Sequence, residues 1–319
     1  MATKATPVSS QPATLGDPAS QQRLRPARRA LRRFLRHRVA VVGVLILLFV
    51  ALFVTAGALF YTEADANYND TSRRLLPPSA AHPFGTDTIG RDILARIIYG
   101  GQISLLIGLT AVSVSVALGT AVGVLSGYFG GALDSLLMRF TEAMLSIPSL
   151  LLLLVMAKFF SGRIPTQVIL GRTFSGSVIV IVVIIGLTSW MYLARIVRSS
   201  VLSIRETEYV LAARALGATS RRIIFVHTLP NTLAPVIVAA TLGVAAAILQ
   251  EAYISFLGVG VQPPTATWGN MLEGSRQYIE DAPWLWVFPG LFIVLTVMSI
   301  NFVGDGLRDA LDPRADKKV

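Results

Sequence analysis

Residue types that catalyse reactions or bind metals are few in this sequence and lie far apart. The chain has no cysteine and only three histidines, His37, His82 and His227. Disulfides, thiol catalysis and thiolate metal sites are therefore excluded, and a histidine metal cage is not expected. No Gly-Lys dipeptide occurs, so a Walker A phosphate loop is absent, and neither Gly-x-Ser-x-Gly nor His-Glu-x-x-His is present. We expect no catalytic residue, no metal site and no cofactor on this chain.

The most informative polar segment runs from residue 205 to 231. Good helix formers occupy Glu208 to Leu216, Gly217 is a natural helix stop, and Arg221 to Val226 should begin a second helical stretch. Ala212 and Ala213 give the first helix a patch with almost no side chain. A helix, a turn and a helix with such a patch indicate a surface that contacts another protein.

Apolar runs on either side must position this segment. The chain is 53% hydrophobic and only 14% charged, whereas soluble proteins are about 25% charged. About 20 apolar residues of helix cross a bilayer, and six spans are expected. Four lie in the uncharged runs 39–62, 97–133, 173–194 and 282–304; the other two are a weaker one around 143–157, with Pro148 inside, and one at 233–249.

Positive charge predicts the orientation of these spans. The net charge of +10 could suggest nucleic acid, but nine of the 28 Lys and Arg residues lie in residues 1–38, directly before the first span. This is typical of a cytoplasmic flank. With the N-terminus inside, 20 of the 28 fall on the inner side. Both termini are therefore predicted to be cytoplasmic, and no nucleic-acid partner is expected.

The predicted organisation is all-α, in three parts. Residues 1–38 are a disordered stretch followed by a basic amphipathic helix that can lie on membrane lipid. Residues 39–305 are the transmembrane domain, with a polar loop at about 198–230, and residues 306–319 are a cytoplasmic tail. In the second span, small residues recur every fourth position and predict close helix packing: Ala111, Ser115, Gly119, Gly123 and Gly127.

The polar loop resembles the EAA loop of ABC importer permeases: Ala212-Ala213, three residues, Gly217, then Leu229-Pro230. Leu211 stands where the motif usually has glutamate, and we expect Glu208 to take that role. Other motifs are similar to the dipeptide/oligopeptide (DppC/OppC-like) branch of these binding-protein-dependent inner membrane components. They are His82-Pro-Phe-Gly-Thr-Asp87, Gly90-Arg-Asp92, Phe256-Leu-Gly258, Gln262-Pro-Pro264, Trp268-Gly269 and Leu311-Asp-Pro313.

The resemblance covers residues 28–314 and implies a six-helix type I ABC importer transmembrane domain in a bacterial inner membrane. Such a subunit forms half of a pathway for di- or oligopeptides. It is not an enzyme: ATP and Mg belong to two partner ATPases. The other implied partners are a homologous permease (DppB/OppB-like) and an extracytoplasmic peptide-binding protein. The residues implied to couple to the ATPase are Glu208, Tyr209, Ala212, Ala213, Leu216, Gly217, Leu229 and Pro230.

Gln250 and Glu251 are candidate pore or gate residues, because an ionisable group in a span normally faces a cavity or a partner. Glu251 could meet a peptide's amino terminus, or instead hydrogen-bond to the loop at 262–268 or to the partner permease. Two other classes of function stay open at this point, a single-chain secondary transporter or channel and an intramembrane hydrolase. The residues do not choose between dipeptides, oligopeptides and nickel complexes as cargo.

Overall fold

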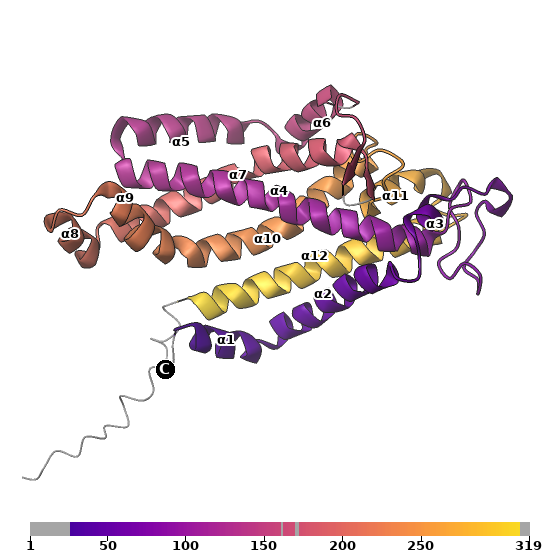
Figure 1. Ribbon diagram of the computed structural model, residues 1–319, viewed down its shortest axis with the longest axis horizontal. Coiled ribbons are helices and arrows are strands. Elements are labelled where there is room, and N and C mark those ends of the chain that lie inside the picture. The colour runs from indigo at the N-terminus through magenta and orange to yellow at the C-terminus, as the bar shows by residue number, and fades with distance from the viewer. Residues whose placement is uncertain (1–25, 161, 170–171, 313–319) are drawn as a thin grey trace, which may run out of the picture.

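The computed structural model describes residues 26–160, 162–169 and 172–312. It is an elongated bundle with α8 at one end and α3 at the other (Figure 1). The expected disordered segment before residue 23, and residues 313–319 of the expected tail, lie outside the described residues.

The bundle begins with α1 (Pro26–Arg36) and α2 (Arg38–Gly57), followed by α3 (Glu63–Asn67), η1 (Thr71–Arg73) and α4 (Ile93–Phe129). Next come α5 (Gly131–Ser146), α6 (Ser149–Phe160), the antiparallel strands β1 (Gln167–Ile169) and β2 (Arg172–Phe174), and α7 (Gly176–Arg205). The chain continues through α8 (Glu208–Ala215), α9 (Ser220–Arg222), the π-helix η2 (Ile223–Thr228) and α10 (Leu229–Phe256). It closes with α11 (Trp268–Gly274), η3 (Arg276–Tyr278) and α12 (Trp284–Leu311).

Five helical stretches among the described residues are long and apolar enough to span a membrane: α2, α4, α7, residues 220–256 and α12. The remaining predicted span, the weaker one around 143–157, falls on a pair of helices, α5 and α6, whose axes are bent by 85°. The bend follows from Pro148, which lacks a backbone N–H and disfavours helical geometry in the preceding residue. At the other end of the chain, α12 continues to Leu311, past the predicted boundary at residue 305.

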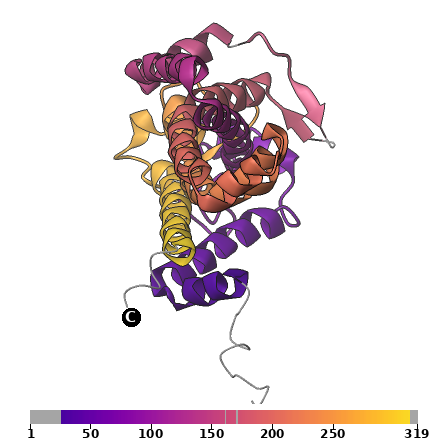
Figure 2. The ribbon, with the colours of Figure 1, turned by 90° about the vertical axis from the view of Figure 1, so that its left-hand side faces the viewer.

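Helices α4 and α7 form the centre of the bundle and pack against each other along most of their length, with α10 beside both. Helices α2 and α12 pair on one side, and α5 and α6 lie on the opposite side (Figures 1 and 2). The largest buried cluster surrounds Trp268 and Phe292, where α2, α4, α10 and α12 meet. Side chains therefore hold together helices that are far apart in sequence.

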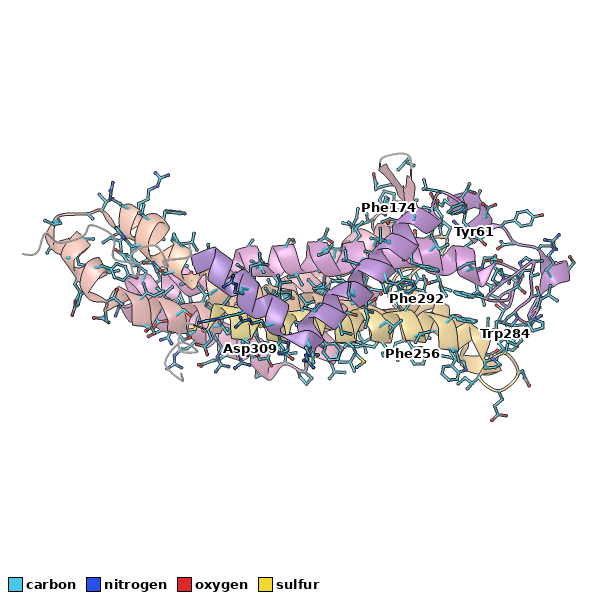
Figure 3. The ribbon with its side chains drawn as sticks, turned by 90° about the horizontal axis from the view of Figure 1, so that it is seen from below. Tyr61, Phe174, Phe256, Trp284, Phe292 and Asp309 are labelled. Carbon is cyan, nitrogen blue, oxygen red and sulfur yellow. The ribbon has the colours of Figure 1, made fainter. Side chains whose placement is uncertain are left out.

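The α3 end of the bundle is folded by local polar contacts. The Asp87 carboxylate accepts hydrogen bonds from the backbone amides of Ile89 and Arg91, at 3.0 and 2.9 Å, and pairs with the Arg91 guanidinium at 2.6 Å. His82 Nδ1 lies 2.8 Å from Asp92 Oδ2. Trp284 of α12, which Figure 3 shows at this end, donates from Nε1 to the Thr86 carbonyl at 3.2 Å. The segment between α3 and α4 is thus an ordered surface.

Candidate functional site

Helix α8 ends as the sequence predicts. Gly217 adopts φ +80°, in the left-handed region that favours glycine. Its N–H donates to the Arg214 carbonyl and the Ala218 N–H donates to the Ala213 carbonyl, both at 3.0 Å. This pair of bonds is the Schellman motif, which satisfies carbonyls that a helix C-terminus leaves unpaired. The helix from Glu208 and the glycine stop are therefore confirmed.

One face of α8 is open to solvent. Val210 is fully buried and joins Ile223 in the cluster between α8 and the ends of α4 and α7. Ala213 is half-buried beside it, whereas Ala212 is exposed and Leu216 is 89% exposed. The exposed face is formed by Glu208, Leu211, Ala212, Ala215 and Leu216, and we call it the α8 face. The structure places Ala212, rather than Ala213, at its middle.

The return from α8 into the bundle is shaped by Pro230. Proline has no N–H and clashes with the carbonyl four residues earlier, which favours a locally wider turn. The π-helix η2 lies directly before it, and the Leu229 N–H bonds to the Ile224 carbonyl, five residues back. Leu229 is half-buried in the cluster that holds Val210, and Tyr209 lies beside His227 with ring centroids 6.3 Å apart. Leu229 thus packs in the cluster that α8 rests on, whereas Pro230 is exposed.

An ion pair lies close to the point where the chain enters α8. The sequence did not predict it. Arg198 of α7 makes two hydrogen bonds of 2.6 Å to the Asp134 carboxylate of α5. Ser126 of α4 also donates to Asp134. Arg205, the last residue of α7, donates from Nη1 to the carbonyls of Gly127 and Tyr128 at 3.2 and 3.3 Å. The ends of α4, α5 and α7 are therefore tied together where the chain enters α8.

The small-residue ridge of α4 is buried against α7 of the same chain. A Cβ atom on Gly123 would lie 2.6 Å from the Ala194 carbonyl oxygen and 2.7 Å from Val197 Cβ. A Cβ atom on Gly119 would likewise lie too close to the carbonyl oxygen of Trp190, and one on Gly127 too close to that of Arg198. Ala111 and Ser115 are buried along the same line. The ridge lets the two central helices lie backbone against backbone.

The structure encloses Glu251 instead of exposing it to an open path. Its side chain is on α10 and only 1% of the residue is exposed. The hydroxyl of Ser255 donates to Oε1 at 2.7 Å and that of Ser104 lies 3.4 Å from Oε2. Gln250 is half-buried and accepts a hydrogen bond from Ser189 of α7 at 3.3 Å. Within the described residues Glu251 is therefore enclosed, whereas Gln250 keeps part of its surface exposed.

Titratable groups outside the spans serve local structure. At the start of α3, the Thr62 backbone N–H and hydroxyl both donate to Asp65 at 2.7 Å. These bonds hold the pKa of Asp65 below its ordinary value. Within the described ranges, no group of three or more His, Asp or Glu side chains could hold a metal ion.

The family models and the relatives that match this chain all describe membrane components of transport systems. Residues 119–317 match the family described as binding-protein-dependent transport system inner membrane component, and residues 25–78 match the N-terminal TM domain of oligopeptide transport permease C. A dipeptide transport system permease protein of Alkalihalophilus pseudofirmus is 43% identical over 91% of this chain and 90% of its own length. An oligopeptide transport system permease protein of Haemophilus influenzae is 40% identical over 89% and 88%.

The fold is also similar to a solved structure of the MetNI methionine ABC transporter, with a TM-score of 0.52 at 24% identity, covering 67% of this chain and 94% of that one. The chain therefore belongs to the binding-protein-dependent transport system inner membrane components, the multi-pass permease subunits of ABC importers.

Proposed function

We propose that this chain is one of two permease subunits in an ATP-driven importer of di- or oligopeptides. It would form half of the translocation pathway with a homologous permease. Two ATPase subunits would supply the energy and bind the ATP and Mg, and an extracytoplasmic binding protein would deliver the peptide. The names of the relatives from Alkalihalophilus and Haemophilus support peptides as the cargo class.

The observation that carries the proposal is the α8 face. It stands at one end of the bundle, is built around Ala212 from side chains that are uncharged except for Glu208, and is backed by the buried Val210. A small-residue patch on a rigid, protruding helix fits a groove on a partner protein. The proposed occupant is the ATPase, so that its opening and closing move α8 and the bundle as a body. Glu208, exposed in the first turn, is the residue proposed to meet it.

Orientation follows from the charge distribution. With α8 in the cytoplasm, both termini are cytoplasmic and 20 of the 28 Lys and Arg residues lie on the inner side. The ordered segment between α3 and α4 then faces outward, together with α11 and its flanking loops. That surface is the proposed contact for the binding protein.

The deciding experiment is reconstitution of the chain with its permease partner, two ATPases and binding protein in lipid vesicles. Addition of peptides of two to six residues should stimulate ATP hydrolysis and accumulate peptide inside vesicles that enclose ATP and carry the ATPases on their inner side, while nickel complexes should not. The chain alone should hydrolyse no ATP. Stimulation by a nickel complex but by no peptide would overturn the proposed cargo.

A further inference from the structure

Glu251 is a buried carboxyl group whose hydrogen bonds lead to one particular segment. We call residues 257–283, which join α10 to α12 and include α11, the α11 cap. Among the described residues no salt bridge involves Glu251, although it is 1% exposed. Burying such a group without a cation is costly unless other polar groups satisfy it. The groups that do so are the hydroxyls of Ser104, Ser255 and Thr267.

Each of the two serine hydroxyls also accepts a backbone N–H from the α11 cap. The Val261 N–H donates to Ser255 Oγ at 3.1 Å, and the Trp268 N–H donates to Ser104 Oγ at 3.2 Å. A serine hydroxyl has one proton and two lone pairs. Accepting the amide leaves its proton free for Glu251. The carboxyl group is thus connected, through the two serine hydroxyls, to both ends of the stretch from Val261 to Trp268, and directly to Thr267 within it.

The contact between the α11 cap and the spans is close and specific. A Cβ atom on Gly269 would lie 2.7 Å from Ala252 Cα, and one on Gly260 would overlap Ser255. The fully buried Trp268 donates from Nε1 to the Ile97 carbonyl of α4 at 3.0 Å. Asn270 donates to the carbonyls of Val261 and Thr265 at 3.1 and 2.9 Å. The cap is rigid in itself and sits directly on α4 and α10.

Helix α10 carries this cap at one end and leads to α8 at the other. Residues 220–256, which comprise α9, η2 and α10, are one continuous span. Phe256, the last residue of α10, lies toward the Trp284 end of the bundle in Figure 3, far from the α8 end. A displacement of the cap moves α10 more directly the more firmly the two are joined, and Glu251 is the residue that the hydroxyls of Ser104, Ser255 and Thr267 share.

We propose that Glu251 is a positioning residue that fixes the α11 cap to α10, so that the extracytoplasmic binding protein acts on the cap and on α8 together. The proposal rests on the proposed function for the identity of that protein. It assigns Glu251 no contact with the peptide. Loss of the carboxyl should release the cap and leave α8 and its partner in place.

The test uses the full reconstituted complex with three variants. Glu251→Leu removes the carboxyl group that the hydroxyls of Ser104, Ser255 and Thr267 share, whereas Glu251→Gln keeps a shared partner, because its amide can accept from one serine and donate to a lone pair of the other. Glu142→Leu removes an exposed carboxyl of α5, outside the α11 cap, and serves as the control. In Glu251→Leu, stimulation of ATP hydrolysis by the loaded binding protein should fall about tenfold, with the unstimulated rate and ATPase co-purification unchanged. Glu251→Gln and Glu142→Leu should behave as the parent does.

A second readout is independent of transport. The chain has no cysteine, so Val261→Cys, at a position that is 2% exposed, supplies a single thiol in the cap. Its reaction with an impermeant maleimide should rise about tenfold in the Glu251→Leu background and not in the Glu251→Gln background. If Glu251→Leu does not assemble, Ser104→Ala with Ser255→Ala removes the two serine links and replaces it.

Unchanged thiol reactivity in Glu251→Leu, or full stimulation by the binding protein in that variant, would each overturn the proposal. Equal loss in Glu251→Gln would also overturn it, because the links would then not be the cause. A parent complex that no peptide stimulates would contradict the proposed function instead, and the maleimide readout would still decide whether Glu251 fixes the cap.

Discussion

Substitution of Gly217 tests whether the turn after α8 faces another protein. At φ +80°, a residue with a Cβ atom costs about 1–2 kcal/mol. Apart from its two neighbours along the chain, no heavy atom of the described residues lies within 4 Å of the place where that Cβ would be. Gly217→Ala and Gly217→Trp therefore carry the same backbone cost within this chain, a roughly 5- to 30-fold shift away from the native turn. Gly217→Asn should cost less, because asparagine adopts this conformation more readily.

The three variants separate the backbone effect from the effect of a partner. All three should insert into the membrane and elute from size exclusion as the parent does. Peptide uptake and co-purification of the ATPases should decrease from Gly217→Asn to Gly217→Ala, following the backbone cost. Gly217→Trp should abolish both, since a large side chain at the edge of the α8 face blocks the proposed groove.

Two outcomes would contradict the proposed roles of α8 and of the turn at Gly217. If Gly217→Trp retains as much ATPase as Gly217→Ala, nothing docks beside the turn, and α8 is not the ATPase contact. If Gly217→Asn is more impaired than Gly217→Ala, the Schellman turn does not explain the glycine. Gly274→Trp is the control for ATPase co-purification, because Gly274 has open space around it and lies in the α11 cap, away from α8.

Three further predictions follow from the fold. Ala212→Asp should leave the chain inserted yet lower ATPase co-purification at least about tenfold, because it would bury an unpaired charge in the proposed groove; normal co-purification would exclude Ala212 from the contact. Gly123→Leu should destabilise the α4–α7 packing by about 1–3 kcal/mol and lower the thermal midpoint of the purified complex, whereas Gly290→Leu, with open space around it, should not. In intact cells an impermeant maleimide should label Ser79→Cys and not Ser220→Cys, both exposed positions; labelling of the latter would reverse the orientation.

Features that depend on local sequence could be predicted. The extent of α8 and the turn at Gly217 follow from helix propensity and from the one residue that tolerates positive φ. The apolar runs predict the spans because a bilayer demands length and lack of charge. The polar, turn-rich stretch from His82 to Asp92 also predicts an ordered surface, since its caps and turns are made by neighbours in sequence.

Features that depend on distant partners could not be predicted. Nothing near Asp134 in the sequence indicates that Arg198 pairs with it, and Ser104 lies far from Glu251 along the chain. The spacing of the α4 ridge predicts close packing but not that α7 is the partner. The pattern places Ala212 and Ala213 together in one patch, and only the packing of Val210 shows which of the two faces outward.

The length of α7 determines how strongly the charge of membrane lipids acts on α8. Its apolar part ends at Arg195, which marks the lipid headgroups in the proposed orientation, and the helix continues to Arg205, about 15 Å farther at 1.5 Å per residue. At physiological ionic strength potentials decay over about 8 Å, so the field of anionic lipids falls to roughly one-seventh before it reaches α8. Helix α1, with Arg32 and Arg36 exposed beside the start of α2, has no such separation. A change in the anionic lipid content of the membrane should therefore alter the electrostatic potential at α1 and change it little at the α8 face.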